Sequence, residues 1–152
     1  MPSAMLSPHF SLAEFTLSQT AARLGLSNQP DMEAYVHLQK LAAVMEVVRS
    51  LCGDVPVTIT SGYRAPAVNK ACGGASNSAH MSGLACDFIV PQFGDPLKIC
   101  QTIEPHMQRL GIDQLIYEFG DWVHLGLCVR ADDPRCQCLT INTTGTSVGF
   151  PA

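Results

Sequence analysis

The chain has 152 residues, of which 47% are hydrophobic and 14% are charged. Such a chain can bury a sizeable core, which excludes an intrinsically disordered protein. The net charge is −4 and the nine lysines and arginines form no basic run, which excludes the clustered basic face of a nucleic-acid-binding protein. We expect one domain over residues 1–152, with a helical part at about residues 10–52 and a strand-rich part at about residues 55–150.

The sequence shows no signal for a membrane or for export. It has no run of eighteen apolar residues, so no spanning helix is predicted. Residues 1–8 lack the basic and apolar regions of a secretory signal. We therefore expect a monomer that is made in a cytoplasm and has no stable membrane association.

Seven cysteines are spread along the chain, and no Cys-x-x-Cys occurs. An odd number without a secretory signal argues against a disulfide framework, and Cys136-Gln137-Cys138 is too tight for the usual zinc knuckle. We expect free thiols, most of them buried as small hydrophobic residues. The seven are Cys52, Cys72, Cys86, Cys100, Cys128, Cys136 and Cys138.

Two helices are predicted in the first third of the chain. Ser11 and Glu14 have the spacing of a capping box, with phenylalanines on either side placed as the hydrophobic staple. This helix should run over residues 12–24 and stop at the glycine that follows. Asp31 should cap a second helix that ends at Gly53. Its buried face is predicted from apolar residues at helical spacing, namely Leu38, Leu41, Met45 and Val48.

Strands dominate the remainder. The β-branched residues at 55–60 predict a strand, and residues 84–90 predict another. A helix that opens at Asp95-Pro96 should reach about residue 110 and kink at Pro105. The other predicted elements are a short helix at 66–71, a polar loop at 72–78, a hairpin of 113–119 with 122–128, and a hairpin of 139–142 with 146–148. Helices first and antiparallel strands later indicate an α+β fold, a central antiparallel sheet flanked by helices.

His80, Asp87 and His124 carry the chemistry. Two imidazoles and one carboxylate leave one position of a tetrahedral metal open, which is typical of hydrolytic zinc sites, whereas structural sites close all four. His80 must reach Asp87 through a turn that Gly83 permits, and Cys86 should point away from Asp87 into the core. The alternative is that His80 and Asp87 share an ordinary loop hydrogen bond while His124 is a satisfied strand histidine.

The predicted hairpin brings a second carboxylate toward this group. Counting residues across its turn places Glu118 directly opposite His124, on the same side of the sheet. Asp121 lies in the turn itself, where aspartate is common for conformational reasons. Arg64 follows the first strand, and its planar fork suits a carboxylate or a developing oxyanion, although a solvated surface arginine is the alternative.

Three motifs change the balance between these alternatives. They are Ser61-Gly62-Tyr63-Arg64, then Ser78-Ala79-His80-x-x-Gly83-x-Ala85-x-Asp87, then Trp122-Val123-His124. In this order they resemble the D-Ala-D-Ala carboxypeptidase-like zinc peptidases, a group that includes the hedgehog domain. Segments 10–15 and 145–149 resemble the phage-associated branch of that group. The resemblance covers nearly the whole chain.

The resemblance implies a hedgehog/D-Ala-D-Ala-peptidase-like fold, with His80, Asp87 and His124 as Zn²⁺ ligands. It also implies a substrate in the stem or cross-bridge peptides of peptidoglycan. Relatives often carry the general base three residues before the last histidine, which is Asp121 here. In the phage-associated branch we expect Glu118, which would take a proton from the attacking water and later deliver it to the leaving amine. Arg64 would position the substrate.

Three functions follow from this resemblance. The first is a phage or prophage endolysin, which waits in the host cytoplasm and then acts at the cell wall. The second is a metal-containing module that binds the wall or a partner without catalysis, and the third is a virion or tail protein with the same fold. The cleaved bond stays open between D-Ala-D-Ala, L-Ala-D-Glu and a cross-bridge.

Overall fold

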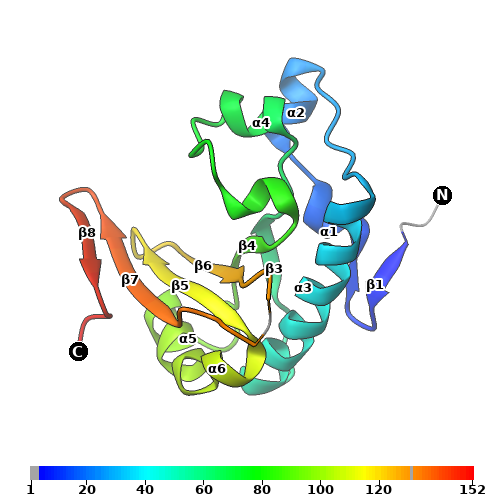
Figure 1. Cartoon of the computed structure of the whole chain (residues 1–152). Coiled ribbons are helices and arrows are strands. Elements are labelled where there is room, and N and C mark those ends of the chain that lie inside the picture. Colours follow the sequence, from blue (N-terminus) through cyan, green and yellow to red (C-terminus); the bar gives the residue numbers. More distant parts are fainter. Residues whose placement is uncertain (1–3, 131) are drawn as a thin grey trace. The chain divides into compact units, whose positions relative to one another are not determined.

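The computed structural model of the chain describes residues 4–130 and 132–152. Figure 1 shows the helices and strands coloured along the sequence. The chain divides into two compact units that interleave in sequence. The first consists of Met1–Glu46 and Ser61–Cys86, and the second consists of Val47–Thr60 and Asp87–Ala152. These borders differ from the division near residue 54 that the sequence predicts. That the chain acts as one domain stays a prediction.

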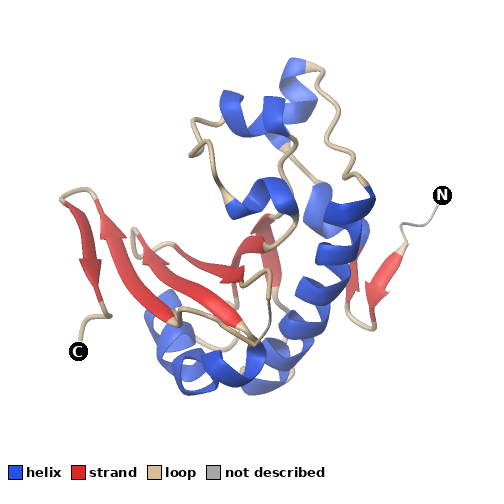
Figure 2. Cartoon of the chain, viewed as in Figure 1, coloured by secondary structure: helices blue, strands red, loops and turns tan. Residues whose placement is uncertain are grey.

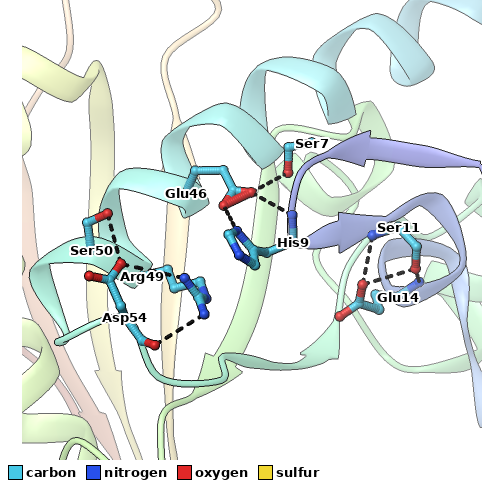
Figure 3. A network of polar contacts seen from close by, with 8 residues as sticks. All are labelled: Ser7, His9, Ser11, Glu14, Glu46, Arg49, Ser50 and Asp54. Atoms are coloured by element: carbon cyan, nitrogen blue, oxygen red, sulfur yellow. Dashed lines mark hydrogen bonds and ion pairs between the residues drawn. The ribbon is translucent and has the colours of Figure 1, made fainter.

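The first unit opens with a short ribbon, β1 (Met5–Ser7) and β2 (Phe10–Ser11), followed by helix α1 (Leu12–Thr16). The predicted capping box is confirmed, because the Ser11 side chain accepts from the Glu14 backbone while Glu14 accepts from the Ser11 backbone (Figure 3). The staple is present as well, with both phenylalanine rings buried and their centroids 5.9 Å apart.

The helix predicted over residues 12–24 is wrong as one continuous element. Leu17 is extended, and Ser18 caps a separate helix, α2 (Gln19–Leu24), by accepting from the backbone of Ala21. A serine that bonds the backbone locally competes with helix continuation. The predicted end is correct, since Gly25 adopts a left-handed conformation with φ of 66°.

Helix α3 (Met32–Leu51) matches the prediction closely. Asp31 accepts from the backbone of Ala34 at 2.8 Å, as a capping residue should. The four residues of the predicted buried face, Leu38, Leu41, Met45 and Val48, are completely buried. Glu46 accepts hydrogen bonds from Ser7 and from the backbone of His9 (Figure 3), which ties α3 to the N-terminal ribbon within the first unit.

Two short helices complete the first unit. Helix α4 (Pro66–Ala71) has the predicted bounds, and the 3₁₀ helix η1 (Ala79–Ser82) replaces the expected loop around His80. Gly83 follows with φ of 76°, and a Cβ there would lie 2.5 Å from the carbonyl oxygen of Ala34. The turn therefore requires glycine, both for its conformation and for its close approach to α3.

A six-stranded sheet carries the later part of the chain, in the order β3-β4-β6-β5-β7-β8. Figure 2 shows these strands in red. The strands are β3 (Thr58–Ser61), β4 (Ala85–Ile89), β5 (Ile112–Glu118), β6 (Trp122–Leu127), β7 (Gln137–Asn142) and β8 (Gly145–Val148). The first begins three residues later than predicted, after Pro56, which has no N–H to give a ladder.

The α+β class is confirmed, but the sheet is not wholly antiparallel. β5 pairs antiparallel with β6, and β7 with β8, whereas β5 and β7 run parallel. A parallel neighbour requires the chain to cross back between the two strands. The segment between β6 and β7 makes this crossing, and Arg135 within it binds the Asp113 carboxylate through its backbone and guanidinium at 2.7–2.9 Å.

Helices of the second unit pack on this sheet. The predicted kinked helix is confirmed as α5 (Pro96–Ile103), a 3₁₀ turn η2 (Glu104–His106) that contains Pro105, and α6 (Met107–Leu110). α5 contacts β5 and β6, and α6 contacts β5. Ile99, Ile103 and Leu115 are fully buried in this layer.

Among the described residues no disulfide joins the cysteines, and the expectation that most of them are buried is wrong. Cys52, Cys86 and Cys100 are buried, Cys72 is exposed, and the remaining three are half-buried. Across the described residues, no helix has the length and apolar character needed to cross a bilayer.

Candidate metal centre

Asp87 and His124 form the part of the site that lies within the second unit. Asp87 stands on β4 and His124 on β6, which are neighbours in the sheet. The Asp87 Oδ1 and His124 Nδ1 atoms are 2.9 Å apart, and the side chains are 10% and 12% exposed. A carboxylate and an imidazole at this degree of burial are little hydrated. Buried charged groups of this kind are paired with each other or coordinate a metal ion.

His80 is held by the first unit. The residue is 3% exposed, and its Nδ1 lies 2.7 Å from the Gly62 carbonyl oxygen, to which it donates as the Nδ1–H tautomer. The Ser78 hydroxyl accepts from the His80 backbone at 3.2 Å and caps η1. A histidine that donates one ring nitrogen to a carbonyl presents the other, Nε2, as a ligand with a fixed ring orientation.

The three predicted ligands form one group. His80, Asp87 and His124 each offer a ligand atom, and these atoms all lie within 4.8 Å of one another. In the alternative interpretation His124 is a separate strand histidine, whereas in the structure its ring contacts the Asp87 carboxylate. Asp87 Oδ1 contacts His124 Nδ1, and the His80 ring contacts the Gly62 carbonyl oxygen through Nδ1.

The Gly62 carbonyl is a functional group that sequence reasoning missed. Gly62 packs directly on the backbone of Phe15, so closely that a Cβ would overlap the Phe15 carbonyl. The next residue, Tyr63, donates its backbone N–H to the same carbonyl at 2.6 Å. The end of α1 therefore fixes the carbonyl that orients His80. A backbone carbonyl cannot be recognised from the type of its residue. The requirement for glycine at position 62 is only a weak signal of it.

The predicted placement of Glu118 is partly wrong. The pairing register sets Ile116, not Glu118, opposite His124, and sets Glu118 opposite Trp122. The prediction made the turn two residues too long, because five residues separate Glu118 from His124 and only three separate Glu118 from its observed partner Trp122. Because alternate residues of a strand face the same side, Glu118 still shares a face with His124 as a diagonal neighbour, roughly 7–8 Å away. Asp121 lies in the turn and donates its backbone N–H to the Glu118 carbonyl at 3.0 Å.

Arg64 is tied to its surroundings rather than extended into solvent. Its backbone N–H donates to the His80 carbonyl at 3.0 Å, its Nε to the Ser61 hydroxyl at 3.3 Å, and its Nη1 to Asn69 Oδ1 at 3.2 Å. Asn28 holds the backbone on both sides of it, donating to the Tyr63 carbonyl and accepting from Ala65. Sequence reasoning did not find either asparagine.

Comparison with known proteins decides the family. The family model described as peptidase M15 matches residues 8–126, which include every candidate site residue. The chain belongs to the peptidase M15 family. Residues 8–126 also take in α1 and Gly62, so the matched region contains the backbone that orients His80.

A curated relative is similar over a shorter stretch. It is the zinc D-Ala-D-Ala carboxypeptidase of Streptomyces albus G, 44% identical over 43 residues. The matched stretch spans 28% of this chain and 17% of the relative. The resemblance to D-Ala-D-Ala carboxypeptidase-like zinc peptidases that the sequence motifs indicate is confirmed. The phage-associated branch stays a prediction.

Proposed function

We propose that this member of the peptidase M15 family is a zinc-dependent peptidase that cleaves peptide bonds in peptidoglycan. The observation that carries the proposal is the group of His80, Asp87 and His124, whose donor atoms lie within 4.8 Å of one another. The zinc carboxypeptidase from Streptomyces albus G supports both the metal and the wall-peptide substrate.

The donor set fits zinc. Two imidazole nitrogens and one carboxylate oxygen are zinc ligands, with bonds of about 2.0–2.2 Å, so neighbouring ligand atoms in a tetrahedral site stand about 3.3 Å apart. The 2.9 Å between Asp87 Oδ1 and His124 Nδ1 is close to this spacing. His80 would bind through Nε2, because its Nδ1 is bonded to Gly62. When bound, zinc supplies Lewis-acid chemistry, polarising the scissile carbonyl and lowering the pKa of water.

Glu118 is our candidate for the general base, with Asp121 as the alternative. Cleavage requires that a water oxygen bonds to the carbonyl carbon, that a proton leaves this water, and that the C–N bond breaks with a proton added to the amine. A carboxylate on the same face as His124 can accept the first proton and donate it to the amine. Glu118 is half-buried on that face, while Asp121 is exposed in the turn.

Arg64 is our candidate for positioning the peptide. Its hydrogen bonds to Ser61 and Asn69 fix the guanidinium plane, and its backbone is bonded to that of His80. A guanidinium held in place can bind a substrate carboxylate in two-pronged fashion or stabilise a developing oxyanion.

The biological role that we propose is an endolysin of phage or prophage origin, stored in the host cytoplasm and active at the wall. The non-catalytic module and the virion or tail protein are the alternatives. Zymography on purified cell walls, with and without a chelator, separates the enzyme from the binding module, since only an enzyme clears the wall and loses that activity with its metal. Mass spectrometry of the digested muropeptides then names the bond.

A further inference from the structure

A cavity of about 470 Å³ lies beside α4 in the first unit. This volume is within the usual range of sites that bind small molecules or single side chains of a peptide. Its walls come from α4, from the glycine-rich loop after it, and from Met81 of η1. A single stretch of sixteen residues therefore builds the whole cavity, from Pro66 to Met81.

The cavity is next to two candidate site residues in the same unit. Met81 directly follows His80, and α4 begins two residues after Arg64. Asn69 joins the two, because it lines the cavity, is 2% exposed, and accepts from Arg64 Nη1. A peptide bound with its scissile bond near His80 would thus have a neighbouring residue within reach of this cavity.

The cavity is preformed by a fixed loop. Asn69 Nδ2 donates to the Ala75 carbonyl at 2.9 Å, and the Gly74 N–H donates to the Asn69 carbonyl at 2.9 Å. A Cβ on Gly74 would overlap the Asn69 amide and stand 2.9 Å from Arg64 Nη1. The absence of a side chain at Gly74 therefore lets the loop close against the asparagine and the arginine together.

The charge of the cavity points to its ligand. Lys70 is the charged residue among those lining it, and no lining residue is acidic, in a chain whose net charge is −4. Arg64 Nη1 lies beside Gly74, one of the lining residues, while Pro66 and Met81 supply apolar surface and Ser76 a hydroxyl. A cation beside apolar walls favours an anionic group carried on an aliphatic stem.

We propose that this cavity is a subsite for a carboxylate-bearing residue of the peptide substrate, next to the bond that is cut. The inference rests on the proposed peptidase function and adds a determinant of specificity to it. Two sources of the carboxylate exist in a stem peptide: the carboxyl group of D-Glu and the C-terminal carboxylate after D-Ala-D-Ala.

Three synthetic stem peptides separate these sources: one with both carboxylates free, one with the D-Glu group as a carboxamide, and one with a C-terminal carboxamide. KM and kcat are measured for the zinc-loaded wild type, for Lys70→Gln and for Lys40→Gln, an exposed lysine on α3 that serves as the control. Lys70→Gln should raise KM about two- to fivefold with kcat unchanged. A rise of this size corresponds to the loss of one partly solvated ion pair.

The peptide that lacks the bound carboxylate should show the same KM with Lys70→Gln as with the wild type, which identifies the source. An equal rise for all three peptides, or no rise for any of them, would overturn the subsite. Lys40→Gln should match the wild type throughout.

A binding measurement that does not depend on cleavage tests the subsite separately from the peptidase proposal. In ¹⁵N-labelled protein, the amide signals of Gly73 and Gly74 should shift when the fully free peptide is added, and should shift less in Lys70→Gln. If these shifts appear while no peptide is cut, the subsite stands and the peptidase proposal fails. If peptides are cut without shifts at either glycine, the subsite is wrong and the peptidase proposal stands.

Discussion

Asp87 Oδ1 lies 2.9 Å from His124 Nδ1, across neighbouring strands of one sheet. This spacing suits two ligands of one metal ion. We expect zinc to bind at one ion per chain, and His124→Ala to lose both the metal and at least about 10³-fold of the activity, since the chemistry depends on the ion. Metal analysis of the purified variants measures this. Full zinc content in the alanine variants of His80, Asp87 and His124 alike would remove the assignment.

Glu118→Gln should retain the zinc and the fold but lose about 10²–10⁴-fold in kcat, the usual contribution of a general base. The amide keeps the shape of the side chain and cannot accept the proton. Asp121→Asn is the matched control, because Asp121 lies in the turn of the same hairpin. A crippled Asp121→Asn beside a fully active Glu118→Gln would move the base to the turn.

Arg64→Lys should impair the enzyme almost as much as Arg64→Ala, by roughly 10²-fold in kcat/KM. Lysine keeps the charge but cannot reproduce the fork that bonds Ser61 and Asn69. Steady-state kinetics on a defined peptide measure the effect. Wild-type kinetics in Arg64→Lys would leave Arg64 without a role in positioning.

The thiols should react in order of their exposure. Cys72 is exposed, while burial raises the pKa of Cys52 to about 11 and that of Cys138 to about 11. Because the thiolate is the reactive form, Cys72 should be alkylated first in the native protein. Under denaturing, non-reducing conditions, mass spectrometry should find all seven alkylated. Six protected cysteines would instead indicate a disulfide-bonded, exported protein.

Reducing agent should leave the melting temperature unchanged, whereas a chelator should lower it. Zinc that binds the folded chain in preference to the unfolded chain stabilises it by mass action, by up to about 2.7 kcal/mol at a free concentration one hundred times Kd. Calorimetry with and without each reagent tests both statements. A melting temperature that is insensitive to chelator would mean that the folded chain does not hold the metal.

Acid should release the segment between β6 and β7. The side-chain hydrogen bond from Arg135 lowers the pKa of the Asp113 carboxyl below its ordinary value. A depressed folded-state pKa gives stability that is present above the unfolded pKa and lost as the pH falls through the folded one. The gain is about 1 kcal/mol or less, because Arg135 is 63% exposed. Asp113→Asn should therefore flatten the stability profile below about pH 4 in urea titrations.

Local signals in the sequence predict most elements of this fold. The Ser11–Glu14 capping box, the buried stripe of α3 and the Pro105 kink each depend on residues within a few positions of one another, and each is confirmed. The break at Leu17 shows the limit of helical periodicity, because a serine cap outweighs it.

Contacts between residues far apart in the sequence could not be predicted. No residue type encodes the parallel pairing of β5 with β7, which depends on a crossing segment closing onto the sheet. The same holds for the Gly62 carbonyl behind His80. The group of predicted ligands could be found because zinc restricts their chemistry, whereas the Glu118 register depends on the exact number of residues in a turn.

The contact of Gly62 with Phe15 couples the zinc affinity of the site to the folding of α1. Local unfolding of α1 would release the Gly62 carbonyl and with it the orientation of His80, so every unfavourable change in α1 should appear as a weaker binding constant for zinc. Conversely, bound zinc should slow hydrogen exchange of the α1 amides, far along the sequence from any ligand. Zinc affinity would then report whether α1 is folded.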